Sequence, residues 1–363
     1  MFSFKKWLLG VSLIVLLPVA GCSASATPAP TKSTPAAEVD LSGIQTYLLG
    51  KLGQLEQASA SQKQAADAYY ALAEEHQFDY AALWQAKQQE VTQKVELARS
   101  AWLLASPLYE QVEGIVAGVP VLSEYDVILD AGGSGDADPD NAVPFDISLP
   151  DGRVLPRPGN LFGVLETTLW GTNPAYSVSG LTTDLNQNGA IDFGESLPDA
   201  NVMKGSADLF DSYVQELGAA AKAWQPTTSD AFTALVIMVP TMNEYFESWK
   251  NSRFVAGESS TQMDFAVISR LSDIQDILSS LEVVYAGVQP LVASADEAQA
   301  VKIGQDLSGL KEFVAGVYTE EQKGRKFSAE EADQLGAEAQ NRATAITGQI
   351  AQIAATLGIM IEE

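Results

Sequence analysis

Residues 184–195 carry oxygen-bearing side chains at the spacing of a calcium-binding loop. The segment reads DLNQNGAIDFGE, and its sixth residue, Gly189, falls where such a loop must turn sharply. The last residue, Glu195, offers a carboxylate that can bind an ion through both oxygens. The pattern predicts a calcium site; the alternative is an Asx-rich turn that binds no ion. The predicted ligands are Asp184, Asn186, Asn188, the carbonyl group of Ala190, Asp192 and Glu195.

The residues on either side of this loop do not predict the helix pair of an EF-hand. Residues 172–183 lack the apolar spacing of an entering helix, and Pro198 follows the loop closely. Without two helices that could open, bound calcium would hold the segment together rather than act as a switch.

The scarcity of nitrogen and sulfur ligands limits the other metal chemistry available to the chain. It has one His and one Cys, which excludes a Cys/His zinc finger and an HExxH zinc site. His76 lies in an acidic stretch at an expected helix end, where a surface role is favoured. The chain has 21 Lys and Arg against 47 Asp and Glu, a net charge of −26. Such a surface repels nucleic acid and suits cations, so we expect no nucleic-acid partner.

The elements that would position these groups are helices. Apolar residues recur every three to four positions between residues 40 and 118, beginning with Ile44, Leu48 and Leu52. Residues 119–160 and 171–200 are irregular, and a hairpin is expected near Asp151. The sequence therefore predicts an all-α fold of packed helical bundles with a long irregular loop region. Helical spacing returns at 161–169, 203–224, 230–249, 263–288, 295–318 and 329–361.

The sequence of residues 1–39 predicts a secretory signal peptide and a flexible tether, followed by a helical domain over 40–363. Two Lys precede an apolar run that fits a secretory signal and is too short to span a bilayer. Small residues before Cys22 form a lipobox, so we expect a signal peptide over 1–21 and a lipid on Cys22; the alternative is a plain signal peptide. Residues 22–39 are rich in Ser, Ala, Thr and Pro, which is typical of a flexible tether. The predicted location is the cell envelope, on the outer membrane if the cell is Gram-negative.

The segment LFGVLETTLWG at 161–171 resembles the GxHxxE helix of imelysin-like proteins, a group that includes EfeO-type iron-uptake proteins and imelysin peptidases. That family pattern ends in Leu-Trp-Gly, as this segment does. The Tyr-Glu-x-x-Glu of another family helix is matched by residues 109–113, and the family's Thr-x-x-Asp by Thr261 and Asp264. The resemblance implies two packed four-helix bundles.

The same resemblance implies a metal site formed by Glu110, Glu113, Glu166 and Asp264. Gly163 stands where the family has its metal-binding His, so only the Glu of that pair is retained. An all-oxygen site favours hard ions such as calcium, manganese or ferric iron over zinc. The alternative is that Glu166 pairs with Arg or backbone groups and the ancestral site is inactive.

Three functions remain open from the sequence. The first, and the one favoured, is a lipid-anchored protein that binds iron or another hard cation and cooperates with envelope iron-transport components. The second is a metallopeptidase of the imelysin type, which the missing His disfavours. The third is an interaction module with a decayed metal site and a calcium-stiffened loop.

Overall fold

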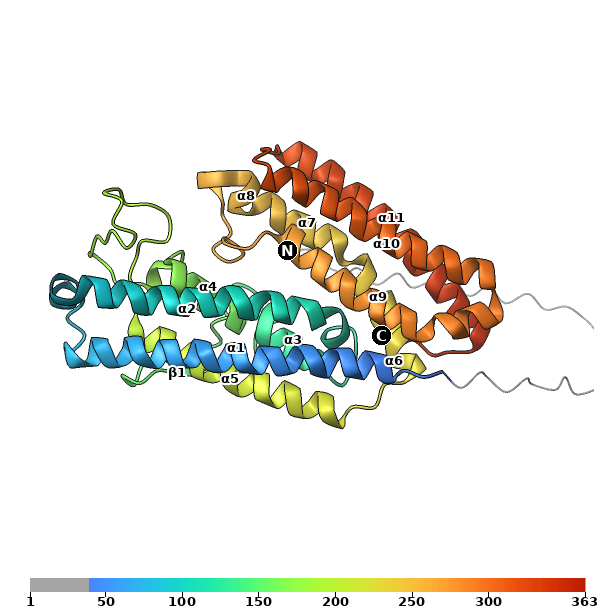
Figure 1. The fold of residues 1–363 in the computed structure, drawn as a ribbon, viewed down its shortest axis with the longest axis horizontal. Coiled ribbons are helices and arrows are strands. Elements are labelled where there is room, and N and C mark those ends of the chain that lie inside the picture. Colours follow the sequence, from blue (N-terminus) through green and yellow to red (C-terminus); the bar gives the residue numbers. More distant parts are fainter. Residues whose placement is uncertain (1–38, 363) are drawn as a thin grey trace, which may run out of the picture. The chain divides into compact units, whose positions relative to one another are not determined.

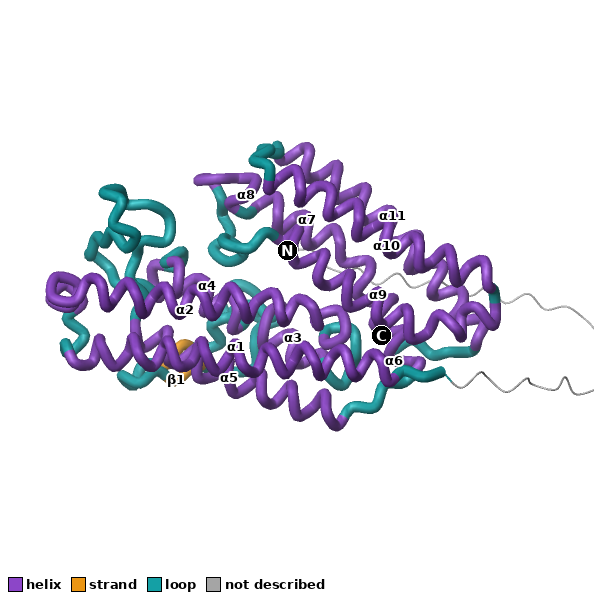
Figure 2. The backbone as a smooth tube through the Cα atoms, in the orientation of Figure 1, coloured by secondary structure: helices purple, strands orange, loops and turns teal. Residues whose placement is uncertain are grey.

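Helices dominate the computed structural model, which describes residues 39–362. The predicted signal peptide, Cys22 and nearly all of the predicted tether lie outside the described residues. The described chain is all-α apart from one two-stranded hairpin, so the predicted fold class is confirmed (Figure 1, Figure 2). The helices are α1 (Ser42–Glu75), α2 (Tyr80–Val116), α3 (Ser123–Asp126), α4 (Leu161–Trp170), α5 (Ala200–Ala223), α6 (Thr228–Met238), α7 (Met242–Asn251), α8 (Arg253–Ala256), α9 (Arg270–Ala295), α10 (Glu297–Gln322) and α11 (Ala329–Leu357).

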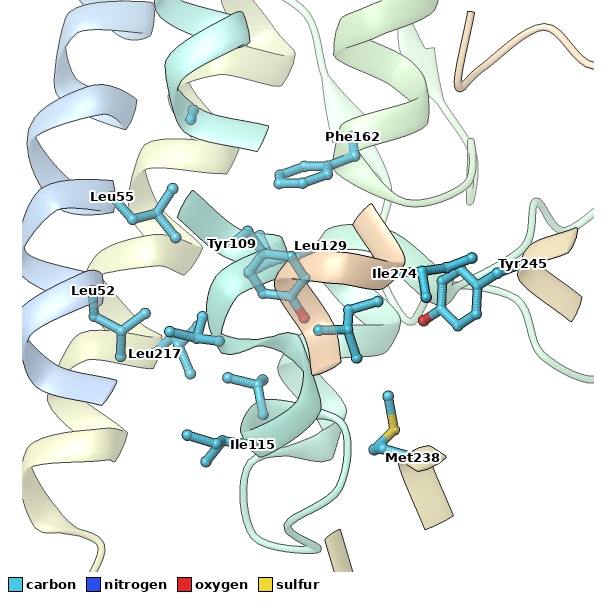
Figure 3. Close-up of a cluster of buried hydrophobic side chains, with 14 of the residues drawn as sticks. Leu52, Leu55, Tyr109, Ile115, Leu129, Phe162, Leu217, Met238, Tyr245 and Ile274 are labelled. Atoms are coloured by element: carbon cyan, nitrogen blue, oxygen red, sulfur yellow. The ribbon is translucent and has the colours of Figure 1, made fainter. Parts of the chain in front are cut away.

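One group of helices is built from the first half of the domain. Helix α1 packs along α2 and α5, and α4 packs against α2 and α5. The packing follows from the sequence, because Ile44, Leu48 and Leu52 recur on one face of α1 and are buried. The ring of Phe162 on α4 meets Trp102 at 4.8 Å and Tyr109 at 5.2 Å between ring centroids, which fixes α4 against α2. Figure 3 shows Phe162 and Tyr109 within this cluster of buried side chains.

The second group is formed by the later helices. Helix α9 packs along α10, and α11 packs along α7 and α10, as Figure 1 shows. Side-chain caps define where these helices begin: Asp296 caps α10, and Ser328 with Glu331 forms a capping box on α11. Helix α9 also packs along α2 and thereby joins the two groups. It is long and apolar enough to span a membrane by composition, but its apolar residues lie in this core.

Two expected helices differ from the structure. The segment expected over 230–249 is divided into α6 and α7 by a short 3₁₀ turn, Val239–Thr241, which contains Pro240. The helix expected from residue 263 begins only at Arg270, where the side chain of Ser269 caps it by accepting from Leu271. Residues 260–269 are therefore irregular.

The irregular region between α3 and α4 contains the expected hairpin. Strand β1 (Ile147–Ser148) pairs antiparallel with β2 (Val154–Leu155) around Asp151 and Gly152. Ahead of it, a single π-helical turn, Val127–Ala131, follows α3 directly. Such turns often occur at functional sites because they displace one residue from the regular helical register.

Candidate metal centre

Three buried carboxyl groups converge between α2 and the π-helical turn. Glu110 and Glu113 lie one helical turn apart on α2, so they share a face, and the π-helical turn brings Asp130 to them. One ligand oxygen from each residue lies within 4.8 Å of the others. The three side chains, which we call the carboxylate trio, are only 1%, 2% and 4% exposed.

Each member of the trio keeps one oxygen without a hydrogen-bond partner. These atoms are Glu110 Oε2, Glu113 Oε2 and Asp130 Oδ1. The other oxygen of Glu113 accepts a hydrogen bond from the hydroxyl group of Tyr245 on α7. Buried polar atoms without partners are rare in native proteins, and a bound ion or water is the usual explanation.

The guanidinium of Arg270, at the start of α9, lies beside the trio. Its nitrogens are 3.7 Å from Glu110, 3.5 Å from Asp130 and 3.0 Å from Asp273. The rings of Phe265 and Tyr245 lie 3.6 Å and 4.7 Å from its central carbon, measured to their centroids. Arg270 is thus held in place by both charge and aromatic contacts.

The charge around the trio is far from balanced. Further carboxyl groups lie near the trio, and among the described residues that line the adjoining cavity Arg270 is the only basic one. Several protons, or a multivalent cation together with protons, are needed to bring these groups near neutrality. The carboxyl groups are Glu110, Glu113, Asp126, Asp130, Glu166, Asp264 and Asp273.

Burial raises the pKa values of several of these carboxyl groups. Loss of solvent raises the pKa of Asp130 to about 7 and that of Asp273 to about 6, although Arg270 opposes both shifts. Burial, reinforced by Asp273 and Glu113, holds the pKa of Glu110 well above its usual range. The cluster therefore retains protons near neutral pH unless a cation replaces them.

A cavity of about 590 Å³ adjoins the trio. Its walls come from α2, the π-helical turn, α4, α7 and residues 261–265, and both Glu113 and Asp130 contribute to them. A water molecule occupies about 30 Å³ of liquid volume, so the cavity can hold an ion with several waters or a small ligand.

The predicted residues Glu110, Glu113 and Asp264 all lie at this centre. Asp264 lines the cavity opposite Gly163, and a Cβ atom built on Gly163 would lie 3.2 Å from Asp264 Oδ2. Burial raises the pKa of Asp264. The position of Gly163 therefore faces the cavity, but it contributes no side-chain ligand.

Glu166 has a different environment from the trio. Its Oε1 accepts hydrogen bonds from the backbone N–H groups of Ala266 at 2.7 Å and Val267 at 3.3 Å. Burial raises the pKa of Glu166 to about 8. Within the described residues, the cavity wall includes its α4 neighbours Gly163, Val164 and Thr167 but not Glu166 itself.

Sequence reasoning missed Asp130, Arg270 and Asp273. Asp130 lies in a stretch interpreted as a loop because of its Pro and Gly content, and a π-helical turn has no simple sequence signature. Asp273 and Arg270 lie three residues apart at the start of α9, a spacing that could have suggested an ion pair because both residues fall within the helix expected over 263–288.

The second candidate site, residues 184–195, folds as a loop held by its own side chains. Asp184 accepts from the backbone N–H groups of Asn188 at 3.1 Å and Gly189 at 2.8 Å. Glu195 accepts from the N–H groups of Asn186 at 3.1 Å and Asp192 at 2.7 Å. Asp184 and Glu195 are thereby turned toward the interior of the loop, as the calcium pattern requires.

This loop is attached to the helical core by Arg99 on α2. The guanidinium of Arg99 donates to the carbonyl group of Gly194 in the loop and to that of Leu169 on α4, the latter at 2.9 Å. No α-helix enters the loop directly, and α5 begins five residues after it ends, at Ala200. Among the described residues on either side of the loop, the helices are thus not arranged as an EF-hand pair.

Together, the fold and the site define an all-helical protein with a buried, oxygen-only cluster beside a cavity. The sequence matches the family model described as Imelysin over residues 44–353. The chain belongs to the imelysin family. The crystal structure of an imelysin-like protein from Psychrobacter arcticum 273-4 is similar to it, with 14% identity and a TM-score of 0.42, over 91% of this chain and 100% of that one. A comparison with curated proteins gave no match.

Proposed function

We propose that this protein binds a hard cation at the carboxylate trio, with the cavity as its access route. The observation that carries the proposal is the convergence of Glu110, Glu113 and Asp130, each buried and each with an unpartnered oxygen. Three oxygens within 4.8 Å of one another match the spacing around a cation with ligand distances of about 2.0–2.6 Å.

The donor set supports a hard ion rather than zinc or copper. Every candidate ligand is a carboxylate, and Gly163 offers no imidazole where the resemblance to imelysin-like proteins would place one. Iron is the cation that the resemblance to EfeO-type proteins favours; calcium and manganese share its preference for oxygen. A role in iron uptake at the cell envelope, with envelope transport components as partners, follows from that choice.

The location in the envelope rests on the lipobox at Cys22. The proposal predicts that the full-length protein carries lipid and sediments with membranes, and that Cys22→Ala abolishes lipid labelling. A protein found wholly in the soluble fraction, with its first 21 residues intact, would contradict the location and leave the metal site untouched.

The loop at 184–195 forms the second part of the proposal, as a structural calcium site. Its support is the sequence pattern together with the inward orientation of Asp184 and Glu195. In this role calcium stabilises the attachment of the loop to Arg99 and does not open the fold.

The trio is tested by elemental analysis and titration calorimetry on purified protein with iron, manganese and calcium. Glu113→Gln and Asp130→Asn each remove one ligand charge while preserving shape, and we expect each to weaken binding by at least about tenfold, or about 1.4 kcal/mol. Glu312→Gln is the matched control, since Glu312 is an exposed residue of α10 outside the cavity wall. If the two ligand variants bind as tightly as the control, the trio is not the site.

A further inference from the structure

Residues 260–268 contribute one wall of the cavity through their central part. Within this segment Thr261, Gln262, Met263, Asp264 and Phe265 are consecutive and all line the cavity. The segment is neither helix nor strand and connects a short 3₁₀ turn, Gly257–Ser259, to the start of α9. We call residues 260–268 the lid segment.

The lid segment is attached to α7 at its first end. The hydroxyl group of Ser260 donates to the carbonyl group of Asn251 at 2.8 Å, and the amide of Gln262 donates to Ser248 at 2.8 Å. Both contacts are polar and half-buried, so this end is fixed on α7 independently of the trio.

At its second end the lid segment is attached to α4 through Glu166. Oε1 of Glu166 accepts the N–H groups of Ala266 and Val267, at 2.7 Å and 3.3 Å. Because Glu166 is 4% exposed, these amides are paired with a carboxyl group that water does not readily replace.

Between these attachments the backbone is strained. Phe265 has a φ of 49°, a left-handed conformation that is unfavourable for a residue with a large side chain. In this conformation the centroid of the Phe265 ring lies 3.6 Å from the guanidinium carbon of Arg270. Strained residues persist only where their surroundings hold them, and here Glu166 bonds the very next residue.

We propose that Glu166 is a positioning residue that holds the lid segment closed over the cavity, and that it controls cation exchange without ligating the cation. The inference rests on the proposed cation binding at the trio. It assigns Glu166 a role distinct from Glu110 and Glu113, since its bonded oxygen is directed to backbone N–H groups rather than to the cavity.

The two roles predict different responses to conservative substitution. Glu166→Gln retains a carbonyl oxygen that can accept both N–H groups but loses the charge that a ligand needs. Glu166→Leu retains the approximate size and loses both properties. If Glu166 is a positioning residue, Gln at this position preserves its function, because Gln can still accept both N–H groups. If Glu166 is a ligand, Gln does not preserve cation binding.

The experiment uses terbium, a hard trivalent ion whose luminescence nearby Tyr residues sensitise, added to the full-length protein. Because Trp170 lies beside Gly194, the loop at 184–195 could also give a signal, so all variants carry Asp184→Ala and Glu195→Ala. Stopped-flow mixing with a chelator measures the rate of terbium release. Hydrogen exchange measures the protection of the Ala266 and Val267 amides in the same variants.

We expect Glu166→Leu to speed terbium release at least tenfold and to deprotect both amides, with terbium entry accelerated as well. Glu166→Gln should stay within about twofold of the parent in both measurements, whereas Glu113→Gln should lose affinity with the amides still protected. If Glu166→Gln loses affinity as Glu113→Gln does while the amides stay protected, Glu166 is a ligand and the inference is wrong. If the parent binds no terbium, the proposed function fails, and amide exchange in Glu166→Leu still reports whether Glu166 holds the segment.

Discussion

Asp264 occupies the space beside Gly163. A Cβ atom on Gly163 would lie 3.2 Å from Asp264 Oδ2 and 3.2 Å from Asn160 Oδ1, closer than most Cβ contacts. The carboxyl group of the lid segment therefore faces the point on α4 from which an imidazole would enter the cavity. This arrangement leaves the centre with oxygen donors only.

Gly163→His should change the metal preference of the centre. An imidazole at this position adds a nitrogen ligand next to Asp264, and nitrogen favours zinc over manganese or calcium. We expect the ratio of zinc to manganese affinity to rise by about tenfold, equivalent to about 1.4 kcal/mol. Competition calorimetry measures the ratio, and Gly163→Ala controls for the crowding that any Cβ introduces. An unchanged ratio in Gly163→His, with the fold intact, would show that this position does not reach the cation.

The stability of the metal-free protein should fall as pH rises from about 4 to about 8. Burial raises the pKa of Glu166 to about 8, of Asp130 to about 7 and of Asp273 to about 6, each above its unfolded value. A group whose pKa is higher in the folded state binds more protons when folded, so its stabilising effect is complete below the unfolded pKa and is lost as pH passes the folded one.

A cation that replaces those protons should stabilise the protein more at high pH than at low pH. Thermal melts with and without manganese across this range measure the difference, at about 1–2 °C for each kcal/mol in a domain of this size. Asp130→Asn should flatten the metal-free profile and reduce the manganese effect. A metal-free protein that becomes more stable between about pH 6 and pH 8 would contradict this assignment of protons.

The sequence predicted the helices more fully than the centre they form. The apolar spacing of α1 could be identified directly, because local packing decides it. The i, i+3 spacing also placed Glu110 and Glu113 on one face of α2. These features depend on residues close together in the chain.

Asp130 and Arg270 could not be assigned in the same way. Asp130 reaches the trio because a π-helical turn displaces it, and Arg270 reaches it because α9 begins seven residues later than the apolar spacing suggested. Glu166 was expected to be a ligand, yet its bonded oxygen accepts two N–H groups that lie 100 and 101 residues further along the chain. Contacts of this range depend on how the helices pack, which residue spacing does not reveal.

Arg270→Gln should destabilise the metal-free protein by about 3–5 kcal/mol, the usual effect of removing one partner from a buried ion pair. The guanidinium lies within 3.7 Å of Glu110, Asp130 and Asp273, so its loss leaves three buried carboxyl groups without their counter-charge. Urea unfolding measures the change.

The same variant should gain more stability from manganese than the parent does, because the ion then supplies the missing charge. Arg342→Gln, which breaks an exposed pair with Glu338, should cost no more than about 1 kcal/mol and serves as the control. A variant that loses stability but responds to manganese no more than the parent would indicate that Arg270 and the cation do not share the site.

Calcium should raise the melting temperature through the loop at 184–195. An ion at one hundred times its dissociation constant adds about 2.7 kcal/mol to the stability of the folded state. Asp184→Ala with Glu195→Ala removes the carboxyl groups at both ends of the loop, so we expect the calcium effect from this site to vanish. Asp136→Ala, in the exposed acidic segment ahead of the hairpin, is the control and should keep it.

The trio can also respond to calcium, so the measurement is made in the background of Glu113→Gln and Asp130→Asn. In that background any remaining calcium effect belongs to the loop. Glu195 is only 6% exposed and bonds two N–H groups, so its replacement lowers the melting temperature even without calcium. The decisive quantity is therefore the rise on adding calcium to each variant. If the loop variant and the control show the same rise, residues 184–195 form a turn stabilised by its own side chains and bind no calcium.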